Sequence, residues 1–312
     1  MHVQDALQAA LDSATGAEHT LCLVVDTAAA EGSYATLDRW KVSYHSLFDG
    51  TPEESLLEIA PLLIPINGLD AETRNRVFAW AQKLAYAAPC LSWVETDVPP
   101  ASMAEHLRRF HVVGLSEGQS LLMRWYDTRI LPVWLACMTA AQAQAFTAHV
   151  SSWAYVDRLG EVSAAAIERP PADFPTTPPY GEPLVTLTDA QYGMLIDATE
   201  LDVLLKHLRQ IIRDELKRVP ERTLTQFVSK YQQAAISAGL GDIDRQAQYL
   251  VVALYTSGKG VEHPAFKALL KSPPLTLDEL AKGIQDLPDE VWDAGPPLWD
   301  SATKASAQAG QN

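Results

Sequence analysis

The chain of 312 residues carries a formal net charge of −15, with 47% apolar and 20% charged residues. Its length favours about two domains, and its composition is that of a globular protein with enough apolar material for real cores. No block rich in Lys or Arg offsets the negative charge. Nucleic acid and anionic membranes are therefore excluded as main partners, whereas a basic protein partner stays open.

The cysteines and the first residues indicate the compartment. Cys22, Cys90 and Cys137 are odd in number, widely spaced and set in apolar surroundings, which is typical of reduced core thiols in a cytosolic protein. The opening MHVQDALQAALDSA lacks the basic segment and apolar core of a secretory signal. No apolar run approaches the roughly 20 residues that cross a bilayer. We expect a cytoplasmic protein without membrane insertion.

Residues 1–167 are predicted to form an α/β lobe, because β-prone runs alternate with helical patterns. Helical patterns cover 3–16, 33–40, 77–84, 99–110, 130–136 and 140–150, and a capping-box pattern starts a short helix at Thr51. The expected strands are 20–25, 42–48, 61–66, 90–94, 112–115 and 121–126, followed by an extended piece at 152–162. This alternation predicts a mixed, largely parallel sheet flanked by helices, with a hairpin at its end.

The rest of the chain is predicted to be a linker, a helical lobe and a tail. Six of the sixteen residues 168–183 are proline, which indicates a stiff connector. Residues 184–290 show apolar side chains at helical spacing, so we expect an all-α lobe there. Residues 291–312 end in ATKASAQAGQN, and this polar, small-residue composition predicts a disordered tail.

Two motifs that suggest catalysis have simpler explanations. Residues 114–118, GLSEG, match the G-x-S-x-G nucleophile pattern but lie between two predicted strands, so a hairpin turn is expected. Residues 256–260, TSGKG, lack the first glycine and the Ser/Thr of a phosphate loop, and they follow a helix, which indicates a helix C-cap. The histidines are scattered, without an H-E-x-x-H or C-x-x-C pair. We predict no catalytic, cofactor-binding or metal-binding residue.

The segment SLLMRWYDTR at 120–129 is the most informative part of the chain. It places Arg124, Asp127 and Arg129 beside Trp125 and Tyr126, where ions are costly unless they are paired. The cluster is either a catalytic site or an ionic clasp that fixes the last strand of the lobe and the helix after it. We favour the clasp, with partners expected from Asp49, Arg108 and Arg109, which stand at a turn or a helix end.

Five landmarks in chain order carry a family resemblance. They are a strand ending in Asp26, then SLFDGTPE at 46–53, APLL at 60–63, HLRRF at 106–110 and MRWYDTR at 123–129. This order resembles the bacterial family called domain of unknown function 4123, whose pieces read approximately SLFDGTPE, APYL, LRRF and FRFYDPRVL. The resemblance covers roughly 21–150. Met123 and Trp125 replace phenylalanine and Thr128 replaces proline, without disturbing the charges.

The resemblance marks a set of signature residues, which we expect to be structural. They are Asp26, Asp49, Gly50, Pro61, Arg108, Arg109, Phe110, Arg124, Tyr126, Asp127 and Arg129.

The resemblance also implies a function. Proteins of this family look like adaptors, or chaperones, of the type VI secretion system, which hold a toxic effector in the cytoplasm and help to load it onto the spike protein VgrG without catalysis. For this chain we expect an effector segment gripped between the two lobes, with direct binding to VgrG left open. One alternative is an enzyme that uses Asp26, Asp49, Arg124, Asp127 and Arg129 on a phosphorylated or carboxylate substrate. Another is a scaffold subunit that self-assembles.

Overall fold

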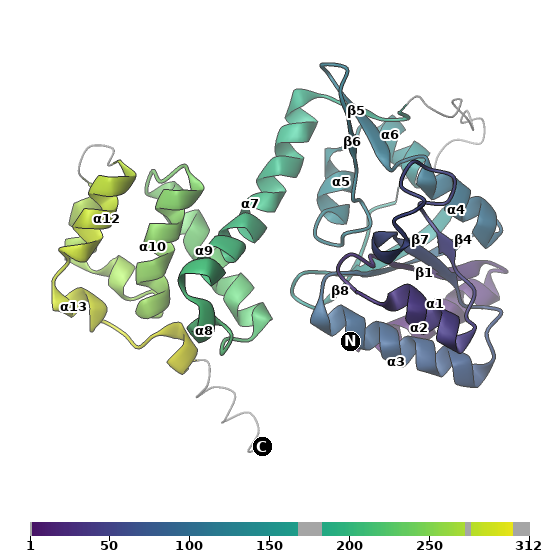
Figure 1. Ribbon diagram of the computed structural model, residues 1–312, viewed down its shortest axis with the longest axis horizontal. Coiled ribbons are helices and arrows are strands. Elements are labelled where there is room, and N and C mark those ends of the chain that lie inside the picture. Colours follow the sequence, from purple (N-terminus) through teal and green to yellow (C-terminus); the bar gives the residue numbers. More distant parts are fainter. Residues whose placement is uncertain (1, 168–182, 272–275, 302–312) are drawn as a thin grey trace. The chain divides into compact units, whose positions relative to one another are not determined.

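The computed structural model describes residues 2–167, 183–271 and 276–301 (Figure 1). The chain divides between Ala198 and Thr199 into two compact units. This boundary falls inside the helix α7 (Asp189–Ile211). The expected Pro-rich linker lies outside the described residues except for Pro183, and the chain that follows it, up to Ala198, belongs to the N-terminal unit.

The N-terminal unit is built from helices and strands that alternate along most of its length. Its elements are α1 (Val3–Gly16), β1 (Thr20–Val25), α2 (Ser33–Trp40), β2 (His45–Ser46), the 3-10 turn η1 (Leu57–Ile59), β3 (Leu62–Pro65), α3 (Ala71–Ala87), β4 (Leu91–Thr96), α4 (Pro100–Arg108), β5 (Val112–Leu115), β6 (Ser120–Leu122), α5 (Leu131–Cys137), α6 (Ala140–Phe146), β7 (Val150–Val156), β8 (Val162–Ala164) and β9 (Thr186–Leu187).

The main sheet corrects the predicted fold class. Its order is β2-β3-β1-β4-β7-β8, and each of these neighbouring pairs is antiparallel. The prediction of a largely parallel sheet is therefore wrong. The helix α3 does connect two strands that run in the same direction, β3 and β4, but β1 lies between them and runs the opposite way. A strand–helix–strand pattern fixes the direction of its two strands without making them neighbours.

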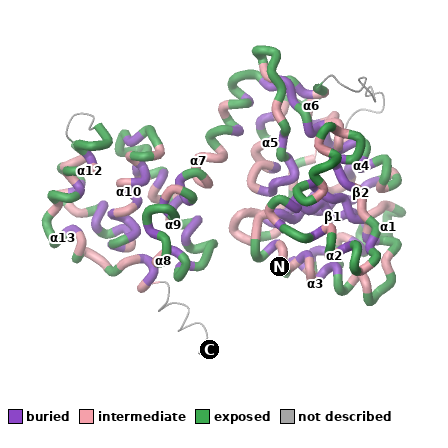
Figure 2. The backbone as a smooth tube through the Cα atoms, in the orientation of Figure 1, coloured by how far each residue is buried: buried purple, intermediate pink, exposed green. Residues whose placement is uncertain are grey.

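The strand β1 is buried on both faces, as its continuous apolar run predicts. Cys22 and Val24 face one core, to which α4, α5 and α6 contribute, whereas Leu21, Leu23 and Val25 face a second core, to which α1 and α3 contribute. The helices thus cover both faces of the sheet, and the buried backbone lies between them (Figures 1 and 2). The end of β1 is consequently deep inside the unit.

A second, smaller sheet has the order β6-β5-β9. The hairpin of β5 and β6 is present as predicted, and the last three residues of the G-x-S-x-G pattern lie in its turn, with Gly118 at a φ of 79°. The strand β6 ends at Leu122, however, four residues before the predicted end. The charged residues from Arg124 onward therefore lie in the turns that lead to α5.

The C-terminal unit contains no strand among its described residues, in agreement with an all-α lobe. After α7 it comprises α8 (Arg213–Leu216), α9 (Glu221–Ser237), α10 (Ile243–Tyr255), η2 (Gly260–Glu262), α11 (Pro264–Leu270), α12 (Leu277–Gln285) and α13 (Asp289–Trp292). Across both units, no described helix is sufficiently long and apolar to cross a membrane.

The C-terminal end of this unit differs from what the composition suggests. Leu298 and Trp299, in the predicted disordered tail, are buried in the core with Leu204 and Leu250, so the ordered chain reaches at least Ser301. The remaining tail residues lie outside the described part.

The TSGKG segment ends α10, with the Gly258 N–H donating to the Ala253 carbonyl over 2.7 Å, as expected for a C-cap.

Candidate functional site

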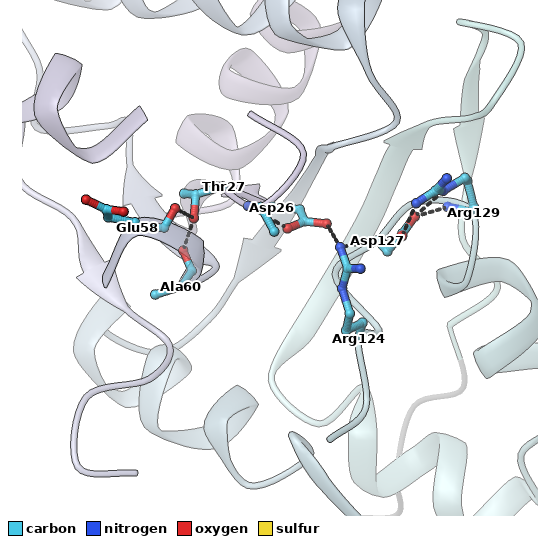
Figure 3. A network of polar contacts seen from close by, with 8 residues as sticks. Asp26, Thr27, Glu58, Ala60, Arg124, Asp127 and Arg129 are labelled. Atoms are coloured by element: carbon cyan, nitrogen blue, oxygen red, sulfur yellow. Dashed lines mark hydrogen bonds and ion pairs between the residues drawn. The ribbon is translucent and has the colours of Figure 1, made fainter. Parts of the chain in front are cut away.

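The candidate site is an ionic cluster at the end of β1. Asp26 follows the last residue of this strand and is fully buried. Its N–H donates to the Cys90 carbonyl over 2.9 Å, and its carboxylate accepts from the Ala28 N–H over 3.1 Å. The second carboxylate oxygen accepts from Nη2 of Arg124 over 2.7 Å (Figure 3). Burial alone makes an unpaired carboxylate costly here, and Arg124 supplies the opposite charge.

Asp127 forms the other half of the cluster. One oxygen accepts from the backbone N–H and Nε of Arg129 over 3.0 and 2.9 Å, and the other accepts from Nη2 of Arg129 over 2.7 Å. Nη2 of Arg124 lies 3.8 Å from the same carboxylate. Arg124 is therefore shared between two buried carboxylates, and the four side chains have no net formal charge.

Local turns place these side chains. The N–H of Asp127 donates to the Arg124 carbonyl over 3.0 Å, and the Asp127 carbonyl accepts from the N–H groups of Ile130 and Leu131, each over 2.9 Å. Leu131 is the first residue of α5. The same residue that holds Arg129 through its side chain thus starts α5 through its backbone. The cluster ties the end of β1 to the start of α5.

The electrostatics of the cluster combine burial and pairing. Burial raises the pKa of Asp26, and Arg124 opposes that shift by its charge and its hydrogen bond. Burial lowers the pKa of Arg124, but the charges of Asp26 and Asp127 outweigh it and the net direction is upward. Burial also raises the pKa of Tyr126 to about 12. Its ring centroid lies 6.0 Å from the guanidinium carbon of Arg124, so this neutral phenol packs against the cation.

Asp49 and Arg108 form a second, separate pair. Nη2 of Arg108 donates to Asp49 over 3.1 Å, while Nε and Nη2 donate to the Ser46 carbonyl over 3.2 and 3.0 Å. This pair ties α4 to the turn after β2, in which Gly50 has a φ of 71°. The sequence predicts Asp49 and Arg108 as partners of the charged cluster that contains Arg124, but the structure pairs them with each other. Arg109 is half-buried. Burial lowers the pKa of its guanidinium, and the charge of Glu105 opposes that shift.

A neutral aromatic group surrounds His111. The His111 ring stacks on Trp125 with centroids 5.5 Å apart, and it meets Phe48 and Tyr126 edge-on at 5.4 and 5.5 Å. Burial lowers the pKa of His111 to about 3, so the ring is neutral near pH 7. The histidines are scattered along the sequence, and no periodic pattern there predicts this packing role of His111.

The remaining signature residues also serve packing. Phe110 is buried, and its ring meets Phe146 at 5.1 Å. The Pro61 carbonyl accepts from the N–H of Leu47 over 2.8 Å and holds the SLFDG segment beside β3. Among the described residues, no three His, Cys, Asp or Glu side chains are grouped to hold a metal ion. As it stands, the arrangement joins strand ends, turns and helices.

The comparisons with known proteins agree with the motif order. Residues 21–145 match the model of the family described as domain of unknown function, DUF4123. The predicted resemblance to this family is confirmed over those residues, which run from β1 to α6. No curated protein and no solved structure matches the chain.

Proposed function

We propose that this protein is a non-catalytic adaptor of the type VI secretion system, which binds a toxic effector in the cytoplasm and helps to load it onto VgrG. The observation that carries the proposal is the DUF4123 match over residues 21–145. The net charge of −15 favours protein partners with basic surfaces over nucleic acid or anionic lipid.

The geometry of the signature residues supports a binding role. Asp26, Arg124, Asp127 and Arg129 pair with one another, and Asp49 pairs with Arg108. Phe110 and Tyr126 are buried. The signature residues thus join elements inside the unit. Such joints keep a binding surface rigid. Rigid surfaces bind with a smaller loss of conformational entropy.

Co-expression tests the proposal. The full chain is produced with the effector encoded beside it, with VgrG, and with a type VI effector from another gene cluster as the control. We expect a stable complex with the neighbouring effector that persists through size-exclusion chromatography, because specific interfaces bury on the order of 1,200 to 2,000 Å². Absence of both the neighbouring effector and VgrG from the purified complex contradicts the adaptor role.

One observation favours a second candidate, an enzyme acting on a carboxylate or phosphate. The Arg124 side chain is 43% exposed although it binds the fully buried Asp26, and an arginine that is open to solvent is suited to bind a carboxylate or phosphate. The substitution Asp127→Asn separates the two functions. A catalytic cluster predicts an unchanged melting temperature with lost turnover, whereas a clasp predicts a lower melting temperature.

A further inference from the structure

The segment between β2 and β3 combines acidic and exposed apolar side chains. Residues 49–60, DGTPEESLLEIA, contain no Lys or Arg and four carboxylates, of which Asp49 pairs with Arg108. Leu56 and Ile59 are 47% and 45% exposed. Glu54 and Glu58 are exposed beside them, and Glu53 is half-buried. Isolated exposed apolar residues are common, but this pair lies within one short turn and is surrounded by like charges.

The 3-10 geometry brings the apolar pair together. The N–H of Ile59 donates to the Leu56 carbonyl over 3.1 Å, and the N–H of Leu56 donates to the Glu53 carbonyl over 2.8 Å. Leu56 and Ile59 therefore stand at the two ends of one hydrogen-bonded turn. Leu57, between them, packs against the core that α1 and α3 share. The segment therefore has an inner face on the core and an outer face that carries Leu56 and Ile59.

The buried hydroxyl of Thr27 holds this segment in place. The hydroxyl of Thr27 lies 2.8 Å from the Ala60 carbonyl and 3.1 Å from the Glu58 carbonyl, and it donates to this pair. Thr27 is fully buried and directly follows Asp26. Figure 3 shows the four charged residues of the cluster together with Thr27 and the carbonyls of Glu58 and Ala60 that its hydroxyl contacts. Exposed side chains on such an anchored turn lose little freedom when a partner covers them.

We infer that the outer face of residues 49–60 is a docking surface for a basic segment with apolar side chains on a partner protein. This inference rests on the proposed function and names the surface that would take the effector or VgrG. Charge complementarity decides between occupants. A second copy of this chain also carries −15, and an anionic membrane repels the same carboxylates. A cationic segment that buries apolar side chains against Leu56 and Ile59 satisfies both features of the face.

The first test uses a fluorescent 14-residue peptide of leucine and lysine in amphipathic helical order, with a lysine-to-glutamate version as the control peptide. Two variants change the surface, Leu56→Ser with Ile59→Ser, and Glu53→Gln with Glu54→Gln and Glu58→Gln. Two matched variants make the same changes elsewhere, Val112→Ser with Leu122→Ser at another exposed apolar pair, and Glu18→Gln with Glu117→Gln and Glu290→Gln.

We expect the lysine peptide to bind the full chain and the glutamate peptide to show no binding. Each surface variant weakens the binding of the lysine peptide by about tenfold or more, as for substitutions of central interface residues. The matched variants stay within about twofold. Bound peptide slows hydrogen exchange at the amides of Leu56 and Ile59. Equal losses in matched and surface variants, or unchanged binding in the surface variants, overturn the inference. So does a dimer in sedimentation that the surface variants abolish, because the occupant is then a second copy.

The second test keeps this inference separate from the adaptor proposal. The surface variants are co-expressed with the neighbouring effector and with VgrG. Loss of either partner in these variants, with retention in the matched ones, supports the docking surface. Retention of both partners overturns the docking surface and leaves the adaptor proposal standing. If the unsubstituted chain binds neither partner, the adaptor proposal fails, and the peptide measurements still decide the surface.

Discussion

Asp127 gathers three hydrogen bonds from Arg129 on one buried carboxylate, with Arg124 close by. The substitution Asp127→Asn keeps the size of the side chain and removes the charge that both guanidinium groups face. Breaking a buried ion pair typically costs about 3 to 5 kcal/mol. Because both arginines are partly exposed, water takes over some of their solvation. We therefore expect a loss of about 2 to 3 kcal/mol in the free energy of unfolding, measured by urea denaturation.

The pair of Asp49 with Arg108 provides the control for that measurement. Its carboxylate is half-exposed, and solvent-exposed ion pairs contribute less than about 1 kcal/mol. Asp49→Asn should therefore leave the urea midpoint almost unchanged. An Asp127→Asn variant as stable as Asp49→Asn would show that the cluster is no structural clasp.

Two buried histidines make the stability depend on pH. Burial lowers the pKa of His106 to about 4 and that of His111 to about 3. In the unfolded chain both rings bind a proton below about pH 6.5, whereas the folded chain leaves them neutral until pH 4 and 3. Above about pH 6.5 both rings are neutral in the folded and the unfolded chain, and the free energy of unfolding is not reduced by them. It falls as the pH drops toward 4, by roughly 1.4 kcal/mol per pH unit for each histidine.

The variant His111→Phe isolates one of these protons. It keeps an aromatic ring beside Trp125 and Phe48 and removes the titrating group. Between pH 6 and pH 4 the slope of the unfolding free energy against pH should decrease by about one proton. Urea midpoints at several pH values measure this slope. An identical slope in both proteins means that His111 is already protonated in the folded chain or does not titrate differently on unfolding.

At this scale the printed sequence predicts part of the cluster. Arg124 and Asp127 sit beside Trp125 and Tyr126, and the cost of burying ions predicts that they are paired. The sequence does not predict that Arg124 pairs with Asp26, because 98 positions separate them and no local periodicity links the two. Asp49 and Arg108 are both identifiable as charged residues at element ends, yet only the packing of α4 on β2 shows that they meet each other.

Individual helices and strands are predictable where the local sequence pattern alone determines them. The run Thr20–Val25 predicts β1, and the spacing of 112–126 predicts the hairpin of β5 and β6. Thr51 is an example of the opposite. Its capping-box pattern predicts a helix, but its hydroxyl donates to the Phe48 carbonyl over 2.8 Å and the segment continues as 3-10 turns up to η1. The antiparallel pairing of β1 between β3 and β4 likewise depends on long-range contacts.

The anchoring of η1 can be tested with Thr27→Val, which has nearly the same shape and lacks the hydroxyl. The carbonyls of Glu58 and Ala60 then lose their buried donor. We expect a loss of about 1 to 2 kcal/mol in the free energy of unfolding. Hydrogen exchange at the amides from Leu56 to Ala60 should become faster, because the turn is released locally.

Thr128→Val is the matched control for this substitution. Thr128 is also buried, but its hydroxyl has no hydrogen-bond partner among the described residues. Removing it should leave stability unchanged or slightly higher, and exchange near η1 should stay as in the unsubstituted protein. Faster exchange near η1 in both variants would mean that the turn responds to general loosening of the unit.

At the scale of the whole molecule, residues 184–198, which follow the predicted linker, belong to the N-terminal unit. The strand β9 pairs in parallel with β5, and the N–H of Gly114 donates to the Val185 carbonyl over 2.9 Å. Nε2 of Gln191 donates to the Cys137 carbonyl and to Oε1 of Gln142, each over 2.8 Å. Proline content indicates a connector, but it does not reveal that the chain returns to the first unit before it forms the second.

Truncation after residue 167 or after residue 198 distinguishes the two boundaries. Val185, Leu187 and Leu195 are buried in the core that β5 and α5 share. Each buried side chain of this type contributes about 1.5 to 3 kcal/mol, so their joint removal approaches the whole stability of an ordinary domain, about 5 to 15 kcal/mol. The fragment 1–198 should elute as a monomer and unfold cooperatively in urea. The fragment 1–167 should aggregate or unfold without a cooperative transition. If both fragments unfold with the same midpoint, residues 183–198 are an appendage, and the first unit ends where the proline-rich segment begins.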